Sequence, residues 1–162
     1  MRYTAKGKYG KSIELTDDKA ALLGSVRRAS WRAIRGAIIS VGGTEYTVAP
    51  RGVFNRTVDV TKDGQQLISC TFKPMGKVVI TTANGTSYTL KRTNFFRGHY
   101  GLFSSQDQQI VTIVPHFKLW FFGITYDIDT DDNYTEGRDT LLLLLLVYAI
   151  NTMQRAAAAA AT

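Results

Sequence analysis

Ten consecutive apolar residues, Leu141 to Ile150, lie near the C-terminus of a chain of 162 residues. A helix formed by this run is apolar on every side, so it must be enclosed by lipid or by protein. A membrane span needs about 20 apolar residues, whereas runs of about 10 to 14 are typical of buried core helices. Four polar residues follow, Asn151, Thr152, Gln154 and Arg155. An arginine costs roughly 2.5 to 3.5 kcal/mol near the bilayer centre. We therefore predict no transmembrane span and a helix over about 139–155 that is buried in protein.

The rest of the composition indicates a single soluble domain. With 44% hydrophobic residues the chain can bury a sizeable core, so we predict one domain over residues 1–155, followed by an alanine-rich tail over 156–162 that can extend the helix. The one cysteine, Cys70, excludes an internal disulfide, and no secretory signal is recognisable at the start. We expect a cytoplasmic protein that can associate peripherally with a membrane.

Three segments of the chain resemble one another at a spacing of about 42 to 45 residues. Residues 43–72 align with residues 85–114, and residues 2–26 align with both. The clearest matches are Tyr46 with Tyr88, Val48 with Leu90, Phe54 with Phe96, Val58 with Tyr100 and Val60 with Leu102. Such spacings are typical of repeat architectures, although three copies can equally close into one domain.

Within each copy, apolar residues alternate with polar ones. Ile13 and Leu15 have polar neighbours on both sides, which is the pattern of a strand with one buried face. Turn residues separate successive strands, for example TKDG at 61–64. We predict four short strands in each copy, with the last strand of the third copy over 117–129.

Twelve strands and one apolar helix define the expected fold. Eight-stranded barrels are filled by side chains alone, whereas an eleven-stranded barrel can hold a central helix. We predict a mainly β protein, a closed twelve-stranded antiparallel barrel of three four-strand pseudo-repeats with the C-terminal helix in its lumen. Leu143, Leu144 and Leu146 should form the core of this helix and be fully buried.

One segment, residues 17–40, also carries a helical pattern. Leu22 and Val26 lie at helical spacing, and arginines occupy other positions on the helical wheel. The aligned residues of the second copy have no such pattern, and Gly24 and Gly36 would each cost about 1 kcal/mol inside a helix. We therefore predict strands here.

The predicted architecture and three local segments resemble a known superfamily. KGKYGKSIELTDD at 6–18, SW at 30–31 and LLLLLLVYAIN at 141–151 look like small bacterial members of the superfamily of tubby C-terminal domains, LURP-one-related proteins and phospholipid scramblases. The likeness covers nearly the whole chain and implies a twelve-stranded barrel around a central helix. It implies little about activity, because function depends on sites rather than on folds.

The sequence shows no pattern that is typical of a catalytic or metal centre. His99 and His116 have no Cys or second His at metal-ligand spacing, and Cys70 falls on an apolar face where a small buried residue is expected. Nucleophile elbows, Walker loops and G-x-G-x-x-G turns are absent from the sequence. We therefore expect a non-enzymatic binding or scaffolding module with no catalytic residues and no cofactor.

The acidic stretch 127–139 contains a candidate calcium loop. Asp127, Asp129 and Asp131 match the first three ligand positions of such a loop, but positions six and twelve hold Asp and Arg in place of Gly and Glu. The resemblance to phospholipid scramblases keeps a calcium-responsive, scramblase-like lipid protein as an alternative. The simpler interpretation is that these carboxylates solvate the loop, and that Asp139 caps the N-terminus of the helix.

Basic residues outnumber acidic ones by 20 to 13, and the net charge of +7 favours acidic partners. One predicted hairpin carries four arginines, Arg27, Arg28, Arg32 and Arg35. Further basic residues lie after the Tyr-Thr strands, at Arg51, Arg56, Lys91, Arg92 and Arg97. Tubby domains recognise phosphoinositide headgroups through basic side chains, so the resemblance implies an anionic phospholipid surface as partner, although no local motif carries over the family's binding residues. A scattered solvated face is the alternative.

Two other classes of partner follow from the aromatic residues. Trp120 and Phe122 share one face of the predicted last strand, and their exposure would favour a protein partner and a role as a structural or assembly subunit. Nucleic acid is not expected, because single-strand binding needs exposed aromatic residues near Arg. Phe54 and Phe96 occupy repeated positions, which we interpret as structural.

Overall fold

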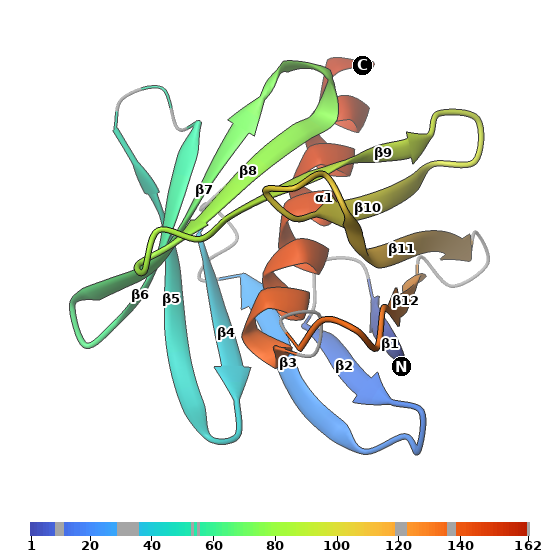
Figure 1. The fold of residues 1–162 in the computed structure, drawn as a ribbon, viewed down its shortest axis with the longest axis horizontal. Helices are drawn as coiled ribbons and strands as arrows, with labels where there is room; N and C mark the ends of the chain where they lie inside the picture. Colours follow the sequence, from blue (N-terminus) through green and yellow to red (C-terminus); the bar gives the residue numbers. More distant parts are fainter. Residues whose placement is uncertain are drawn as a thin grey trace.

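The fold is known from a computed structural model, which describes residues 1–8, 12–28, 36–52, 54, 56–118, 123–135 and 139–161. Within these residues twelve strands form a closed barrel around one long helix (Figure 1). The strands are β1 Arg2–Lys8, β2 Ile13–Asp17, β3 Leu22–Arg28, β4 Ala37–Val41, β5 Thr44–Arg51, β6 Thr57–Lys62, β7 Gln65–Lys73, β8 Lys77–Thr82, β9 Ser87–Asn94, β10 His99–Phe103, β11 Gln109–Lys118 and β12 Gly123–Thr130. The helix α1 spans Thr140–Ala160, and a short 3-10 turn, η1, spans Pro74–Gly76.

Each strand pairs antiparallel with the strand before and after it in the sequence, and β1 pairs with β12 to close the barrel. This order confirms the predicted closed, twelve-stranded antiparallel barrel with a C-terminal apolar helix. Closure leaves no edge strand among these twelve, so the barrel wall offers no row of free backbone groups for pairing with another chain. The description as three repeats stays a prediction from the sequence.

The up-and-down topology gives the barrel two distinct ends. β12 ends at the same end at which α1 begins, and α1 then runs back through the lumen (Figure 1). We call this the entry end, and its turns lie at 18–21, 42–43, 63–64, 83–86 and 104–108. The opposite end, where α1 leaves the barrel, is the exit end, and its described turns join β5 to β6, β7 to β8 and β9 to β10.

The strands bury alternate side chains, as their period of two predicts. In β6, Val58 and Val60 are fully buried while Thr57, Asp59 and Thr61 lie on the outer face. Inward-facing Val, Ile, Leu and Tyr side chains from all twelve strands form one core cluster with the helix. The barrel therefore has a packed interior rather than an open channel.

The helix α1 fills the lumen. Every residue from Leu142 to Ile150 is buried, and Leu143, Leu144 and Leu146 are fully buried, as predicted. By length and composition α1 would also suit a membrane span, but the buried core helices of soluble proteins meet the same criteria. In this structure the apolar run is enclosed by protein, which satisfies all of its faces.

The two ends of α1 follow from local chemistry. Asp139 caps the N-terminus, as predicted, because its Oδ1 accepts hydrogen bonds from the backbone N–H groups of Leu141 at 2.9 Å and Leu142 at 3.3 Å. At the other end the helix continues to Ala160, beyond the predicted end at 155, because alanine is the strongest helix former. Residues 156–161 are exposed and project from the exit end (Figure 1).

Two ambiguous segments are resolved by the strand pairing. Residues 17–40 contain β3 and β4, as predicted, and residues 29–35 lie outside the described part of the chain. The predicted last strand over 117–129 was wrong at its start, because Phe117 and Lys118 end β11 and β12 begins at Gly123. Residues 119–122 of the predicted strand lie outside the described residues. No residue from 117 to 122 has a strong turn preference, so no local pattern in this segment predicts a hairpin.

Candidate functional site

The candidate site is a hollow in the outer wall of the barrel near the exit end, which we call the basic hollow. It has a volume of about 580 Å³ and is formed by η1 with parts of β7, β8 and β9. Its lining residues are Lys73, Pro74, Met75, Lys77, Val79, Lys91, Arg92 and Phe95. Four of the eight are cationic and none is acidic, so the hollow presents a concentrated positive charge to solvent.

A strained turn shapes one wall of the basic hollow. Met75 and Gly76 follow Pro74 with φ angles of 65° and 71°. Glycine adopts this left-handed conformation freely, whereas it costs a residue such as Met roughly 1–2 kcal/mol. The same turn sets Lys73 opposite Lys77 in the pairing of β7 with β8, and like charges directly opposite each other destabilise a sheet. Neither feature stabilises the barrel, which favours a role for this turn at the surface.

The opposite wall comes from β9. Arg92 donates a hydrogen bond through Nε to the Tyr100 hydroxyl at 3.3 Å, and its guanidinium carbon lies 5.7 Å from the centre of the Tyr100 ring. A second ring, that of Phe95, lies 6.0 Å from the same carbon, so the guanidinium is held between aromatic side chains. Lys91 is less available, because its Nζ lies 3.2 Å from Asp107 Oδ1.

The remaining cations of the basic hollow are open to an external anion. Among the described residues, no carboxylate forms an ion pair with Lys73, Lys77 or Arg92. Arginine binds phosphate through a planar fork of N–H groups, and lysine binds it as a compact point charge. The arrangement is therefore suited to a phosphate or another small oxyanion.

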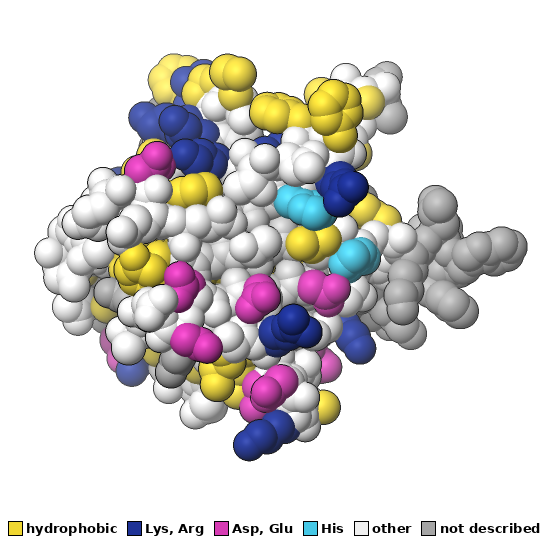
Figure 2. Space-filling view, turned by 45° about the vertical axis from the view of Figure 1, so that its right-hand side comes forward, with side chains coloured by type: hydrophobic (Ala, Val, Ile, Leu, Met, Phe, Trp, Pro, Cys, Tyr) yellow, Lys and Arg dark blue, Asp and Glu magenta, His cyan; other side chains and the backbone are white. Residues whose placement is uncertain are grey.

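Charge is distributed unevenly between the two ends of the barrel. Cations at or beside the described turns of the exit end are Arg51, Arg56, Lys73, Lys77, Arg92 and Arg97, and those turns contain no Asp or Glu. The entry end carries Asp17, Asp18, Glu45, Asp63, Asp107, Asp131 and Asp132, together with Lys19 and Lys62. Figure 2 shows dark-blue and yellow side chains along the upper edge of the molecule, while most magenta side chains lie lower on the same face. The exit end therefore faces solvent as the more basic end.

Large apolar side chains are also exposed at the exit end. Of the seven exposed large hydrophobic residues in the described part of the chain, five lie there, namely Phe54, Met75, Phe95, Phe96 and Phe117. Phe54 is 84% exposed and Phe96 is fully exposed, so the interpretation of these two repeated positions as structural was wrong. Both residues lie in turns beyond the last strand pairs, where their side chains have no core to enter.

The arginine hairpin predicted from the sequence is only partly described. Arg27 and Arg28 are adjacent on β3 and so project to opposite faces of the sheet. Arg27 Nη2 lies 3.3 Å from Glu45 Oε1, and Arg28 is half-buried at the last position of β3. Arg32 and Arg35 lie outside the described residues, as do Trp120 and Phe122 of the predicted partner surface.

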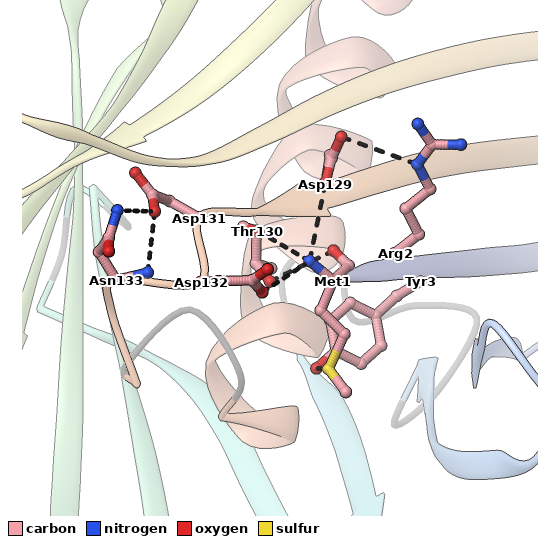
Figure 3. Close-up of polar contacts among 8 residues, drawn as sticks. All are labelled: Met1, Arg2, Tyr3, Asp129, Thr130, Asp131, Asp132 and Asn133. Atoms are coloured by element: carbon pink, nitrogen blue, oxygen red, sulfur yellow. Dashed lines mark hydrogen bonds and ion pairs between the residues drawn. The ribbon is translucent and has the colours of Figure 1, made fainter.

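The three aspartates proposed as calcium ligands do not converge. Asp127 Oδ2 lies 2.8 Å from His116 Nε2, and Asp129 Oδ2 lies 3.9 Å from Arg2 Nε. Asp131 Oδ1 instead accepts hydrogen bonds from the backbone and side-chain nitrogens of Asn133, both at 2.9 Å (Figure 3). Among the residues that the structure describes, no three His, Cys, Asp or Glu side chains form a group that could hold a metal ion.

The N-terminus also takes part in this acidic region. The Met1 ammonium lies 3.0 Å from Asp132 Oδ1 and donates a hydrogen bond to the Thr130 carbonyl oxygen at 3.0 Å (Figure 3). These contacts join the first residue of the chain to the end of β12, beside the seam that closes the barrel. The acidic stretch therefore has a structural role at the entry end.

The remaining candidate side chains show no reactive arrangement. Cys70 is fully buried, and burial, with a smaller effect of the Asp59 carboxylate, raises the pKa of its thiol to about 12. The thiol is therefore protonated at neutral pH, whereas a reactive cysteine needs a thiolate. His116 is exposed and paired with Asp127, and His99 is half-buried at the start of β10.

Sequence reasoning missed Lys73 and Lys77, although the segment KPMGK at 73–77 carries a recognisable signal. A Pro-containing tight turn flanked by two lysines brings like charges together, which is unfavourable unless the charges bind an anionic partner.

Comparisons with models of protein families, with curated proteins and with solved structures found no match. The candidate site therefore rests on the geometry of this chain alone.

Proposed function

We propose that this protein is a non-enzymatic binding module that associates peripherally with anionic phospholipid surfaces through the exit end of its barrel. The basic hollow carries this proposal, because it holds Lys73, Lys77 and Arg92 without a carboxylate partner among the described residues. Each Lys or Arg held close to an anionic membrane contributes about 1 kcal/mol, so several cations on one end favour measurable binding. The acidic entry end would face away from the membrane.

The proposal is tested by flotation with vesicles of phosphatidylcholine alone and of phosphatidylcholine with phosphatidylserine. We expect binding to the anionic vesicles only. Binding should weaken as salt rises, because the screening length falls from about 10 Å at 0.1 M to about 3 Å at 1 M. Absence of binding to anionic vesicles at low salt would reject the proposed function.

A matched pair of variants separates the basic hollow from net charge. Lys73→Gln with Lys77→Gln removes two exposed cations from the exit end, and Lys19→Gln with Lys62→Gln removes two from the entry end. The first pair should lower the partition coefficient by about 30-fold, which corresponds to about 2 kcal/mol. The second should lower it less than threefold. Equal losses for the two pairs would show that binding depends on net charge and not on the hollow.

A protein partner is the second candidate, and the 65% exposure of Phe117, which shortly precedes Trp120 and Phe122 in the sequence, favours it. In that case the chain would be a structural or assembly subunit, would bind neither kind of vesicle, and would co-purify with its partner.

A gel shift with mixed oligonucleotides tests nucleic acid in the same series of experiments, because Phe54 and Phe96 are exposed near Arg56 and Arg97. Lipid is favoured over nucleic acid because the exposed apolar groups lie at separate turns and not along one groove.

The alternative of a calcium-responsive lipid protein is not favoured by the geometry. Asp127, Asp129 and Asp131 each have a different nearby partner and do not share one space. Calcium takes six to eight oxygen ligands, which these separate carboxylates do not supply together.

A further inference from the structure

We infer that the exposed apolar side chains of the exit-end turns insert between lipid headgroups, so that the barrel stands on the bilayer with its exit end down. The inserting residues are Phe54, Met75, Phe95 and Phe96. This inference rests on the proposed function, because it specifies how the same end of the barrel meets an anionic bilayer.

The same arrangement occurs in all three of the described exit-end turns. Arg51 and Arg56 flank Phe54, Lys73 and Lys77 flank Met75, and Arg92 and Arg97 flank the pair Phe95 and Phe96. The apolar residue lies in the turn, and the cations lie in the turn or on the strands beside it. Of these cations, Arg51 is also paired with Asp59, with its Nε 3.2 Å from Asp59 Oδ2. An apolar tip can therefore enter the interface while its cations stay at the level of the lipid phosphates, as in amphipathic interfacial segments.

The turns of the entry end provide the contrast. They consist of short or polar residues, namely Asp18, Lys19, Ala20 and Ala21, then Gly42 and Gly43, Asp63 and Gly64, Ala83 to Thr86, and Ser104 to Gln108. None of these turns holds a large apolar side chain. Leu22, at the first position of β3, is an exposed large apolar residue near this end. The apolar tips are therefore a property of one end and not of turns in this barrel generally.

The exposed tips do not stabilise the barrel. Met75 is 87% exposed and lies in a backbone conformation that residues other than glycine rarely adopt. Phe96 is fully exposed, so neither side chain contributes to the core. Polar substitutions at Phe54 and Phe96 should therefore leave the fold intact, which makes these residues suitable for a test of binding.

A bilayer fits this end better than another protein surface does. The tips lie on separate turns around the end of the barrel and are interspersed with cations, so they do not form one continuous apolar patch. A fluid anionic interface can admit separate tips and neutralise the cations between them. A second copy bound through its own exit end would bring like charges together.

Fluorescent labelling tests insertion directly. Phe96→Cys and Leu22→Cys each place one accessible thiol on the surface, because the native Cys70 is fully buried and its thiol is unreactive. With an environment-sensitive label, Phe96→Cys should show a blue-shifted emission on addition of phosphatidylserine-containing vesicles, and Leu22→Cys should show none. A label at Phe96→Cys that stays in an aqueous environment while the protein is vesicle-bound would overturn the inference.

Serine variants give a second, independent measurement. Phe54→Ser with Phe96→Ser should lower the partition coefficient by at least tenfold, because burial of each Phe side chain is lost. Leu22→Ser should change it less than twofold, and unchanged thermal unfolding should show that all the variants are folded. The residual binding of the double variant should be more sensitive to salt than that of the wild type, because only the electrostatic contribution remains.

The outcomes separate this inference from the proposed function. If the wild type binds anionic vesicles and the serine variants bind equally well, the proposed function stands and insertion is wrong. If the wild type binds no vesicle, both are wrong. If Phe54→Ser with Phe96→Ser instead abolishes a gel shift or the recovery of a protein partner, the tips serve that partner and the inference is also wrong.

Discussion

Two buried polar side chains show how strongly the barrel interior favours neutral groups. Burial is the main cause that raises the pKa of the Tyr126 hydroxyl above its usual range, while a hydrogen bond donated by Asn151 opposes the shift. Burial likewise raises the pKa of the Cys70 thiol from 9.0 to about 12. Both groups stay protonated in the fold at a pH where they would ionise in the unfolded chain, so both link stability to alkaline pH.

Cys70→Ala should therefore reduce the fall in the free energy of unfolding that the wild type shows as the pH rises above 9. Well below pH 9 the thiol is protonated in both the folded and the unfolded state, so its ionisation does not make the free energy of unfolding depend on pH. Above pH 9 the unfolded thiol ionises while the folded thiol keeps its proton up to about pH 12, so the free energy of unfolding falls as pH rises. Between pH 9 and 10 the wild type should lose about 1 kcal/mol more than Cys70→Ala. Urea unfolding at the two pH values measures the difference, and parallel losses would contradict it.

At the start of α1, Asp139→Ala should destabilise the protein by about 1 kcal/mol, because two backbone N–H groups lose their acceptor. Asp139→Asn is the matched control, since asparagine caps a helix almost as well. Thermal unfolding of the two variants should separate them. A loss of equal size in both would assign the effect to the carboxylate charge and not to capping.

At the scale of secondary-structure elements, α1 depends on the barrel more than on its own propensity. Its side chains are buried from Leu142 to Ile150, so the helix has no polar face to present to water. The wall in turn needs the helix, because a barrel of twelve strands is too wide for its own side chains to fill. Helix and barrel should therefore unfold together.

Leu143→Ala, Leu144→Ala or Leu146→Ala should each cost roughly 2 to 5 kcal/mol, through lost burial and through a cavity that a closed barrel cannot collapse to fill. Leu22→Ala is the matched control, because Leu22 is 63% exposed and should cost less than 1 kcal/mol. Urea midpoints of the four variants provide the comparison. Losses below about 1 kcal/mol for all three helix variants would mean that the helix is peripheral to the stability of the fold.

The elements were predictable where a local period determined them. Alternation along the strands and the all-round apolar run are local patterns, and both predict the observed barrel and helix. The hairpin from β11 to β12 lacked a turn residue, so its position depended on strand pairing that the sequence does not display. The prediction of Phe54 and Phe96 as structural residues was wrong because an internal repeat shows which positions correspond, but not whether those positions lie in a strand or in the turn beyond its end. The Lys73 and Lys77 pair likewise depends on hairpin register.

For the whole molecule, closure decides where partners can bind. The wall formed by the twelve described strands has no free strand edge, so recognition falls to side chains on its outer face and to the turns at the two ends. The exit end combines cations with exposed apolar side chains, and the entry end carries most of the acidic residues of the turns. An anionic surface would therefore orient the barrel with its axis steep to the membrane.

Hydrogen exchange on vesicles should reveal this orientation. On phosphatidylserine-containing vesicles we expect backbone amides of the exit-end turns at 75–76 and 95–98 to exchange more slowly, because these turns enter the interface. Amides of the entry-end turns at 42–43, 63–64 and 83–86 should exchange at the rates found in solution, since they face away from the membrane. Phosphatidylcholine vesicles are the control and should slow neither set. Protection of both ends along neighbouring strands such as β5 to β8 would instead mean that the barrel lies on its side, and that its outer wall is the contact surface.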